Sequence, residues 1–112
     1  MQQTQYRKLI RDRVPEIIRQ DGYDCTLEIM GEEEYRQALQ EKLVEEALEA
    51  ASANEEHLLT ELADLCEVMG ALMDLSGIGP EALRNEQQRR RDERGSFKQR
   101  LRLLSIISPA NE

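Results

Sequence analysis

At 112 residues, the chain is long enough for one domain with a modest hydrophobic core and too short for two. Its net charge of −8 argues against binding to nucleic acid or to anionic membranes, because such binding usually relies on overall positive charge. The hydrophobic residues, 39% of the chain, include no Trp and one Phe, so the core must be aliphatic, which favours packed helices. We therefore expect a single, mainly α-helical domain over residues 1–112, with its core at 6–104 and disordered ends at 1–5 and 108–112.

The N-terminal part is predicted to be an extended segment followed by a short helix. Asp12 is the expected N-cap of a helix of about two turns, with a Pro in the first turn and a Gly after the last. Three cations lie at or before the start of this helix, where the helix dipole does not favour positive charge: Lys8, Arg11 and Arg13. They are either surface cations paired with the many acids of the chain or a clamp for phosphate.

A strand and a long helix are predicted next. Residues 23–30 alternate in polarity, which is typical of a short strand. Residues 32–52 are predicted to be helical, because strong helix formers dominate and neither Pro nor Gly interrupts them. The arc expected to face the core, opposite Glu45 and Glu49, comprises Leu39, Leu43, Val44, Ala47, Ala50 and Ala51. The acidic side would then face a second helix or a second subunit.

A second long helix is predicted over residues 55–75, with Gly77 at its C-terminal end. Its apolar residues cover more than half of the circumference: Leu62, Leu65, Val68, Met69, Leu72 and Met73. A helix that is apolar over so wide an arc should be more than half buried. In so small a chain this indicates a homodimer, with a four-helix bundle built from two helices of each subunit.

The C-terminal part is predicted to be a helix and a strand. The helix should cover residues 80–93, because Pro is favoured in a first turn, and Arg91 and Arg94 should share one of its faces. Residues 97–107 carry alternating apolar side chains, which favours a strand. Pairing with residues 23–30 would give a small two-stranded sheet beside the helices.

Two acidic motifs on the long helices give the clearest indication of function. The first is Glu45-Glu46-x-x-Glu49; with about 100° per residue, Glu45 and Glu49 share one helix face and Glu46 borders it. The second is Glu61-x-x-Asp64, which falls on the arc that must face the core, where unpaired carboxylates are rare. Hard oxygen ligands without His or Cys suit Mg²⁺ or Mn²⁺. The alternative is a solvated acidic face.

These motifs resemble the signature of the all-α, MazG-like nucleoside triphosphate pyrophosphohydrolase superfamily, which includes the phosphoribosyl-ATP pyrophosphohydrolases and the dimeric dUTPases. Residues 8–18, Lys-Leu-Ile-Arg-Asp-Arg-Val-Pro-Glu-Ile-Ile, and residues 94–97, Arg-Gly-Ser-Phe, resemble the flanking segments of a house-cleaning branch of these enzymes. The resemblance covers residues 6–104. The interval between the two acidic motifs is short, which implies a tight turn between the helices.

The resemblance implies a Mg²⁺- or Mn²⁺-dependent enzyme that splits a nucleoside triphosphate into the monophosphate and pyrophosphate, in the house-cleaning of noncanonical nucleotides. The implied metal ligands, one of which could instead serve as the base for water, are Glu45, Glu46, Glu49, Glu61 and Asp64. The implied phosphate contacts are Lys8, Arg11, Arg13, Arg91, Arg94 and Lys98. Two alternatives stay open. One is phosphoribosyl-ATP hydrolysis, which the resemblance of the N-terminal segment disfavours, and the other is a non-catalytic helical dimerisation module.

The cysteine content and the absence of targeting patterns indicate a compartment. The chain contains 2 Cys and shows no signal-peptide pattern, and no apolar run approaches the roughly 20 residues that a membrane-spanning helix needs. We expect a cytoplasmic homodimer that acts on a small nucleotide, with no nucleic-acid or membrane partner.

Overall fold

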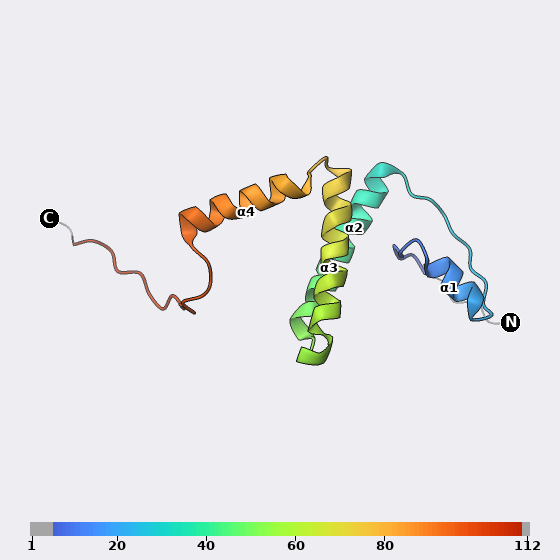
Figure 1. Ribbon diagram of the computed structural model, residues 1–112, viewed down its shortest axis with the longest axis horizontal. Coiled ribbons are helices and arrows are strands. Elements are labelled where there is room, and N and C mark those ends of the chain that lie inside the picture. The colour runs from blue at the N-terminus through green and yellow to red at the C-terminus, as the bar shows by residue number, and fades with distance from the viewer. Residues whose placement is uncertain (1–5, 111–112) are drawn as a thin grey trace. The chain divides into compact units, whose positions relative to one another are not determined.

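The computed structural model describes residues 6–110, which divide into one compact unit ending at Ile78 and another starting at Gly79. These described residues form four helices (Figure 1): α1 (Val14–Gln20), α2 (Glu32–Ser52), α3 (Glu55–Leu75) and α4 (Pro80–Arg94). No strand occurs within residues 6–110, so the mainly α-helical prediction is confirmed. Of the residues predicted to be disordered, 1–5 and 108–112, residues 108–110 form neither helix nor strand, and the others lie outside the described part of the chain. Among the described helices, none is both long and apolar enough to cross a lipid bilayer.

Helix α1 starts slightly later than predicted. Arg13 is its N-cap residue, and no side chain caps the first turn. The predicted cap, Asp12, was wrong because the Val14 N–H donates to the Arg11 carbonyl at 3.0 Å, forming a turn that precedes the helix. Pro lies in the first turn as predicted, and Gly22, with φ of +90°, takes the chain out of the helix.

Helices α2 and α3 pack against each other as an antiparallel hairpin (Figure 1) and have the predicted bounds. At the tight turn between them, the Asn54 side chain accepts a hydrogen bond from the His57 N–H at 3.1 Å, which caps α3. At the other end of the hairpin, Arg36 donates to the Ser76 hydroxyl at 3.0 Å. This arrangement places the middle of α2 opposite the middle of α3, where the acidic motifs lie.

The face that α2 turns toward α3 differs from the prediction. Leu39, 2% exposed, and Glu46 are its buried residues, and Leu43 and Ala50 are half-buried. These four positions follow the i, i+4, i+7, i+11 spacing of a single helix face. Val44, predicted to face the core, is instead exposed. The expectation that acids and core residues occupy opposite sides of this helix was therefore wrong, since Glu46 belongs to the buried face.

The packed face of α3 matches the prediction. Glu61 and Asp64 are half-buried, as are Leu65, Val68 and Leu72 of the same arc. No residue of α3 is fully buried, however, so the expectation that more than half of this helix is buried is not met within the chain.

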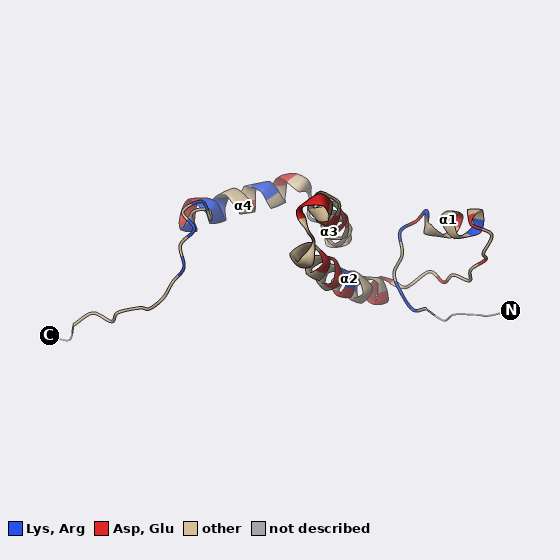
Figure 2. Cartoon of the chain, turned by 90° about the horizontal axis from the view of Figure 1, so that it is seen from below, with Lys and Arg blue, Asp and Glu red and all other residues tan. Residues whose placement is uncertain are grey.

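The second unit contains α4 and the residues that follow it. The last turn of α4 is basic, through Arg91 and Arg94, and Figure 2 shows Lys and Arg gathered toward its C-terminal end. Residues 97–107 are irregular, and so are residues 23–30 of the first unit. A strand needs a neighbouring strand to bond its N–H and C=O groups, and neither segment has one within residues 6–110. The predicted two-stranded sheet was therefore wrong for this part of the chain.

Candidate metal centre

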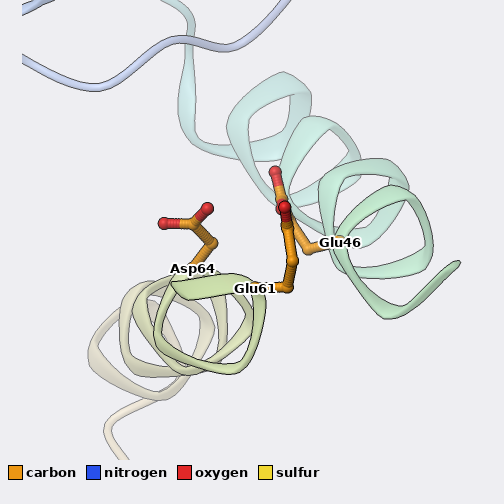
Figure 3. Close-up of side chains that lie close together, drawn as sticks. All are labelled: Glu46, Glu61 and Asp64. Atoms are coloured by element: carbon orange, nitrogen blue, oxygen red, sulfur yellow. The ribbon is translucent and has the colours of Figure 1, made fainter. Parts of the chain in front are cut away.

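Three carboxylates from the two packed helices meet in the first unit (Figure 3). Glu46 comes from α2, and Glu61 and Asp64 come from α3; one oxygen of each lies within 4.8 Å of the other two. Glu46 is only 8% exposed, and the other two are half-buried. Carboxylates held this closely away from water require protons or cations to offset their repulsion.

The spacing of these residues along α2 and α3 explains why the three carboxylates lie together. Glu61 and Asp64 are three residues apart, so they project from the same face of α3. Glu46 occupies a position of the α2 face that otherwise holds aliphatic side chains. The hairpin then sets these two faces against each other, so the same packing that buries the aliphatic residues also gathers the acids.

Two oxygens of the cluster lack partners. Glu46 Oε2 and Glu61 Oε2 are buried and accept no hydrogen bond from the described residues. Buried polar atoms nearly always have a partner, so these two oxygens leave acceptor capacity that a ligand can satisfy. Three carboxylates offer the hard oxygen donors that Mg²⁺ and Mn²⁺ prefer, with no soft donor among them. The residues present therefore fit a divalent cation of this kind.

The environment disfavours ionisation of two of the three carboxyls, Glu46 and Glu61. Burial raises the pKa of Glu46 above its ordinary value, and the negative charge of Glu49 raises it further, while Lys42 acts in the opposite direction. Partial burial likewise raises the pKa of Glu61, followed by the charges of Glu49 and Asp64. Without a metal, Glu46 and Glu61 thus hold protons more tightly than isolated carboxyls do.

The other two acids of the predicted set border this cluster. Glu45 is half-buried, and its Oε1 lies 3.6 Å from Lys8 Nζ. Glu49 is exposed, although it is close enough to raise the pKa of both Glu46 and Glu61. The five acids predicted as ligands therefore divide into three that meet and two at the margin.

The predicted phosphate-binding cations divide as well. Arg11 donates to Asp64 Oδ1 at 2.9 Å, and Lys8 pairs with Glu45, so both lie on the acidic site. Arg13 instead donates to Glu16 Oε2 of its own helix at 3.0 Å. The second unit carries the remaining three, Arg91, Arg94 and Lys98.

Lys42 is a third cation of the site, because its Nζ lies 3.5 Å from Glu45 and 3.8 Å from Glu46, at the i, i+3 and i, i+4 spacings that favour such pairs. Sequence reasoning missed the burial of Glu46. The burial of Glu46 could have been found from its seven-residue distance to Leu39, the most buried residue of the chain's described part.

Comparison with known proteins supports one family. The family described as phosphoribosyl-ATP pyrophosphohydrolase matches residues 4–91, which include all five acids and most of α4. Arg94 and Lys98 follow the matched region. No curated protein matches the chain, and no solved structure does.

Proposed function

Because the chain belongs to the phosphoribosyl-ATP pyrophosphohydrolase family, within the all-α MazG-like superfamily, we propose that it is a metal-dependent nucleoside triphosphate pyrophosphohydrolase. Water would add across the anhydride bond between the α and β phosphates, giving the nucleoside monophosphate and pyrophosphate. The observation that carries this proposal is the meeting of Glu46, Glu61 and Asp64, with two buried oxygens left without partners.

Each group of residues has a role in this proposal. Glu46, Glu61 and Asp64 hold Mg²⁺ or Mn²⁺, with Glu45 and Glu49 as further ligands or as the base for water. A divalent ion supplies charge neutralisation for the triphosphate and lowers the pKa of the attacking water. Phosphoryl transfer depends mainly on positioning and electrostatics, so the proposed reaction needs no nucleophilic side chain. Lys8 and Arg11, which pair with acids of the site, are the proposed phosphate contacts of the first unit. The other predicted phosphate-binding residues, Arg13, Arg91, Arg94 and Lys98, remain predictions that rest on the resemblance.

The favoured substrate class is noncanonical nucleoside triphosphates. The resemblance of residues 8–18 and 94–97 to a house-cleaning branch supports this choice, while the family description supports phosphoribosyl-ATP as the second candidate. Both carry the same triphosphate, so the acidic site serves either. Such an enzyme would act in the cytoplasm, and free Cys25 and Cys66 suit a reducing compartment.

A pyrophosphate-release assay tests the proposal. We expect Mg²⁺- or Mn²⁺-dependent release of pyrophosphate in equal amount to the monophosphate from standard or damaged nucleoside triphosphates, and little from phosphoribosyl-ATP. Orthophosphate release without pyrophosphate would contradict cleavage between the α and β phosphates. Absence of any metal-dependent turnover across the panel would instead favour a non-catalytic module.

We also propose that two copies of the chain form a four-helix bundle. Both helices of the hairpin leave aliphatic residues in water: Leu48 of α2 is 65% exposed and Leu59 of α3 is 80% exposed, with Val44 and Leu62 exposed as well. Exposed aliphatic residues on paired helices are typical of a subunit interface. A second hairpin would bury them.

Leu48→Glu should disrupt this homodimer, because it places a charge in an apolar interface. We expect sedimentation equilibrium to give a dimer for the parent and a monomer at the same concentration for Leu48→Glu. Gln37→Glu adds the same charge at another exposed position of α2 and should stay dimeric. A monomeric parent, or a dimer that tolerates Leu48→Glu, would exclude this interface.

A further inference from the structure

Two cations of the N-terminal segment form ion pairs with carboxylates that we propose as metal ligands. Arg11 reaches Asp64 at 2.9 Å, and Lys8 reaches Glu45 at 3.6 Å. Residues 6–11 form neither helix nor strand, so these ion pairs are long-range contacts made by an irregular segment. The segment therefore contacts the acidic site through side chains that are themselves candidates for phosphate binding.

Both ion pairs are of the weak, exchangeable kind. The side chains of Arg11 and Asp64 are 59% and 37% exposed, and those of Lys8 and Glu45 are 55% and 39% exposed. Ion pairs so open to water contribute little to stability, because solvent screens the attraction and side-chain entropy opposes it. A stronger competitor for either partner can separate them without unfolding the hairpin.

The net charge of the site indicates which ligands can displace these ion pairs. With all groups ionised, the five acids face three cations, Lys8, Arg11 and Lys42, so two negative charges remain, the charge of one divalent ion. Lys42 belongs to α2 and is held beside Glu45 and Glu46 by its own helix. Lys8 and Arg11, in contrast, belong to a segment that forms neither helix nor strand. A triphosphate arriving with metal would bring new negative charge to the place where these two cations are released.

We propose that Arg11 and Lys8 exchange partners during binding: they pair with Asp64 and Glu45 in the metal-free protein, and they move to the substrate's triphosphate once a divalent metal takes these carboxylates. This inference rests on the proposed function. It makes Arg11 a competitor of the metal and a ligand of the phosphates, so its removal must strengthen one binding step and weaken the other. A purely structural ion pair would give no such opposite effects.

Calorimetric titration of Arg11→Gln separates the two steps. We expect Mn²⁺ alone to bind roughly fivefold more tightly than to the parent, because a positive charge near the ion is removed. With Mg²⁺ saturating, inorganic tripolyphosphate should bind roughly tenfold more weakly, because the fork of the guanidinium is lost. Arg19→Gln is the matched control: Arg19 pairs with Asp24 at 3.4 Å, and both affinities should stay within about twofold of the parent.

Limited digestion with trypsin gives an independent readout, because trypsin cleaves after Lys and Arg and therefore after Lys8 and Arg11. Mg²⁺ alone should speed cleavage at these two sites by roughly threefold, and added tripolyphosphate should reverse the gain. Unchanged or weaker Mn²⁺ binding by Arg11→Gln, or unchanged tripolyphosphate binding, would overturn the exchange while leaving the proposed function standing. A parent that binds neither Mn²⁺ nor Mg²⁺ would overturn both.

Discussion

Glu46→Gln is expected to lower kcat/KM for the nucleoside triphosphate by at least about a hundredfold, which corresponds to roughly 2.7 kcal/mol of transition-state stabilisation. Glu46 is the most buried member of the cluster, and its Oε2 has no partner among the described residues. Loss of its charge removes a metal ligand that water cannot easily replace. Coupled detection of released pyrophosphate, at saturating Mg²⁺, measures the effect.

Reduced stability should not explain this loss. Glutamine has the shape of glutamate and lacks its charge, so the metal-free variant should melt at a higher temperature than the metal-free parent. Glu41→Gln makes the same change at an exposed position of α2 and should keep parental kinetics. The structure also predicts different effects at neighbouring acids. Glu45→Gln should lower kcat/KM less than Glu46→Gln does, since Glu45 lies at the margin of the cluster beside Lys8 and Lys42. Equal losses would contradict the three-carboxylate centre.

The helices could be predicted because their signals are local. Runs of strong helix formers, the Pro at the start of α4 and the absence of breakers within α2 and α3 define the elements without reference to the rest of the chain. The grouping of Glu61 with Asp64 is equally local, since it follows from a separation of three residues on one helix.

The features that sequence reasoning missed depend on contacts between elements. Whether Glu46 borders an acidic stripe or joins the buried face is decided by the face that α2 turns toward α3, and its helical position is compatible with both. The pairing of Arg11 with Asp64 joins residues 53 positions apart, which no local pattern encodes. Strands were predicted from alternation alone, although a strand also requires a partner, and residues 23–30 have none within residues 6–110.

Mg²⁺ at about one hundred times its dissociation constant should raise the melting temperature at pH 7.5 by about 10 °C or more, because binding to the folded state alone contributes roughly 2.7 kcal/mol. The size of the gain should depend on pH. The pKa values of Glu46 and Glu61 are raised in the folded protein, chiefly by burial. Stability that depends on protonation of these carboxyls is therefore fully present below their unfolded pKa values and is lost as pH rises through the folded ones.

Protons and Mg²⁺ thus offset the same repulsion, and each should make the other less effective. As pH falls toward the ordinary range of carboxyls, the metal-free protein should recover stability and the gain from Mg²⁺ should shrink. The rest of this acidic chain also gains protons, so the measurement is the difference between the parent and a Glu46→Gln, Glu61→Gln double variant, each melted with and without Mg²⁺ across the pH range. The double variant should melt higher than the metal-free parent at pH 7.5 and respond weakly to Mg²⁺. A parental response to Mg²⁺ in this variant would mean that the ion binds elsewhere, and Glu46 and Glu61 would then lose their assignment as ligands.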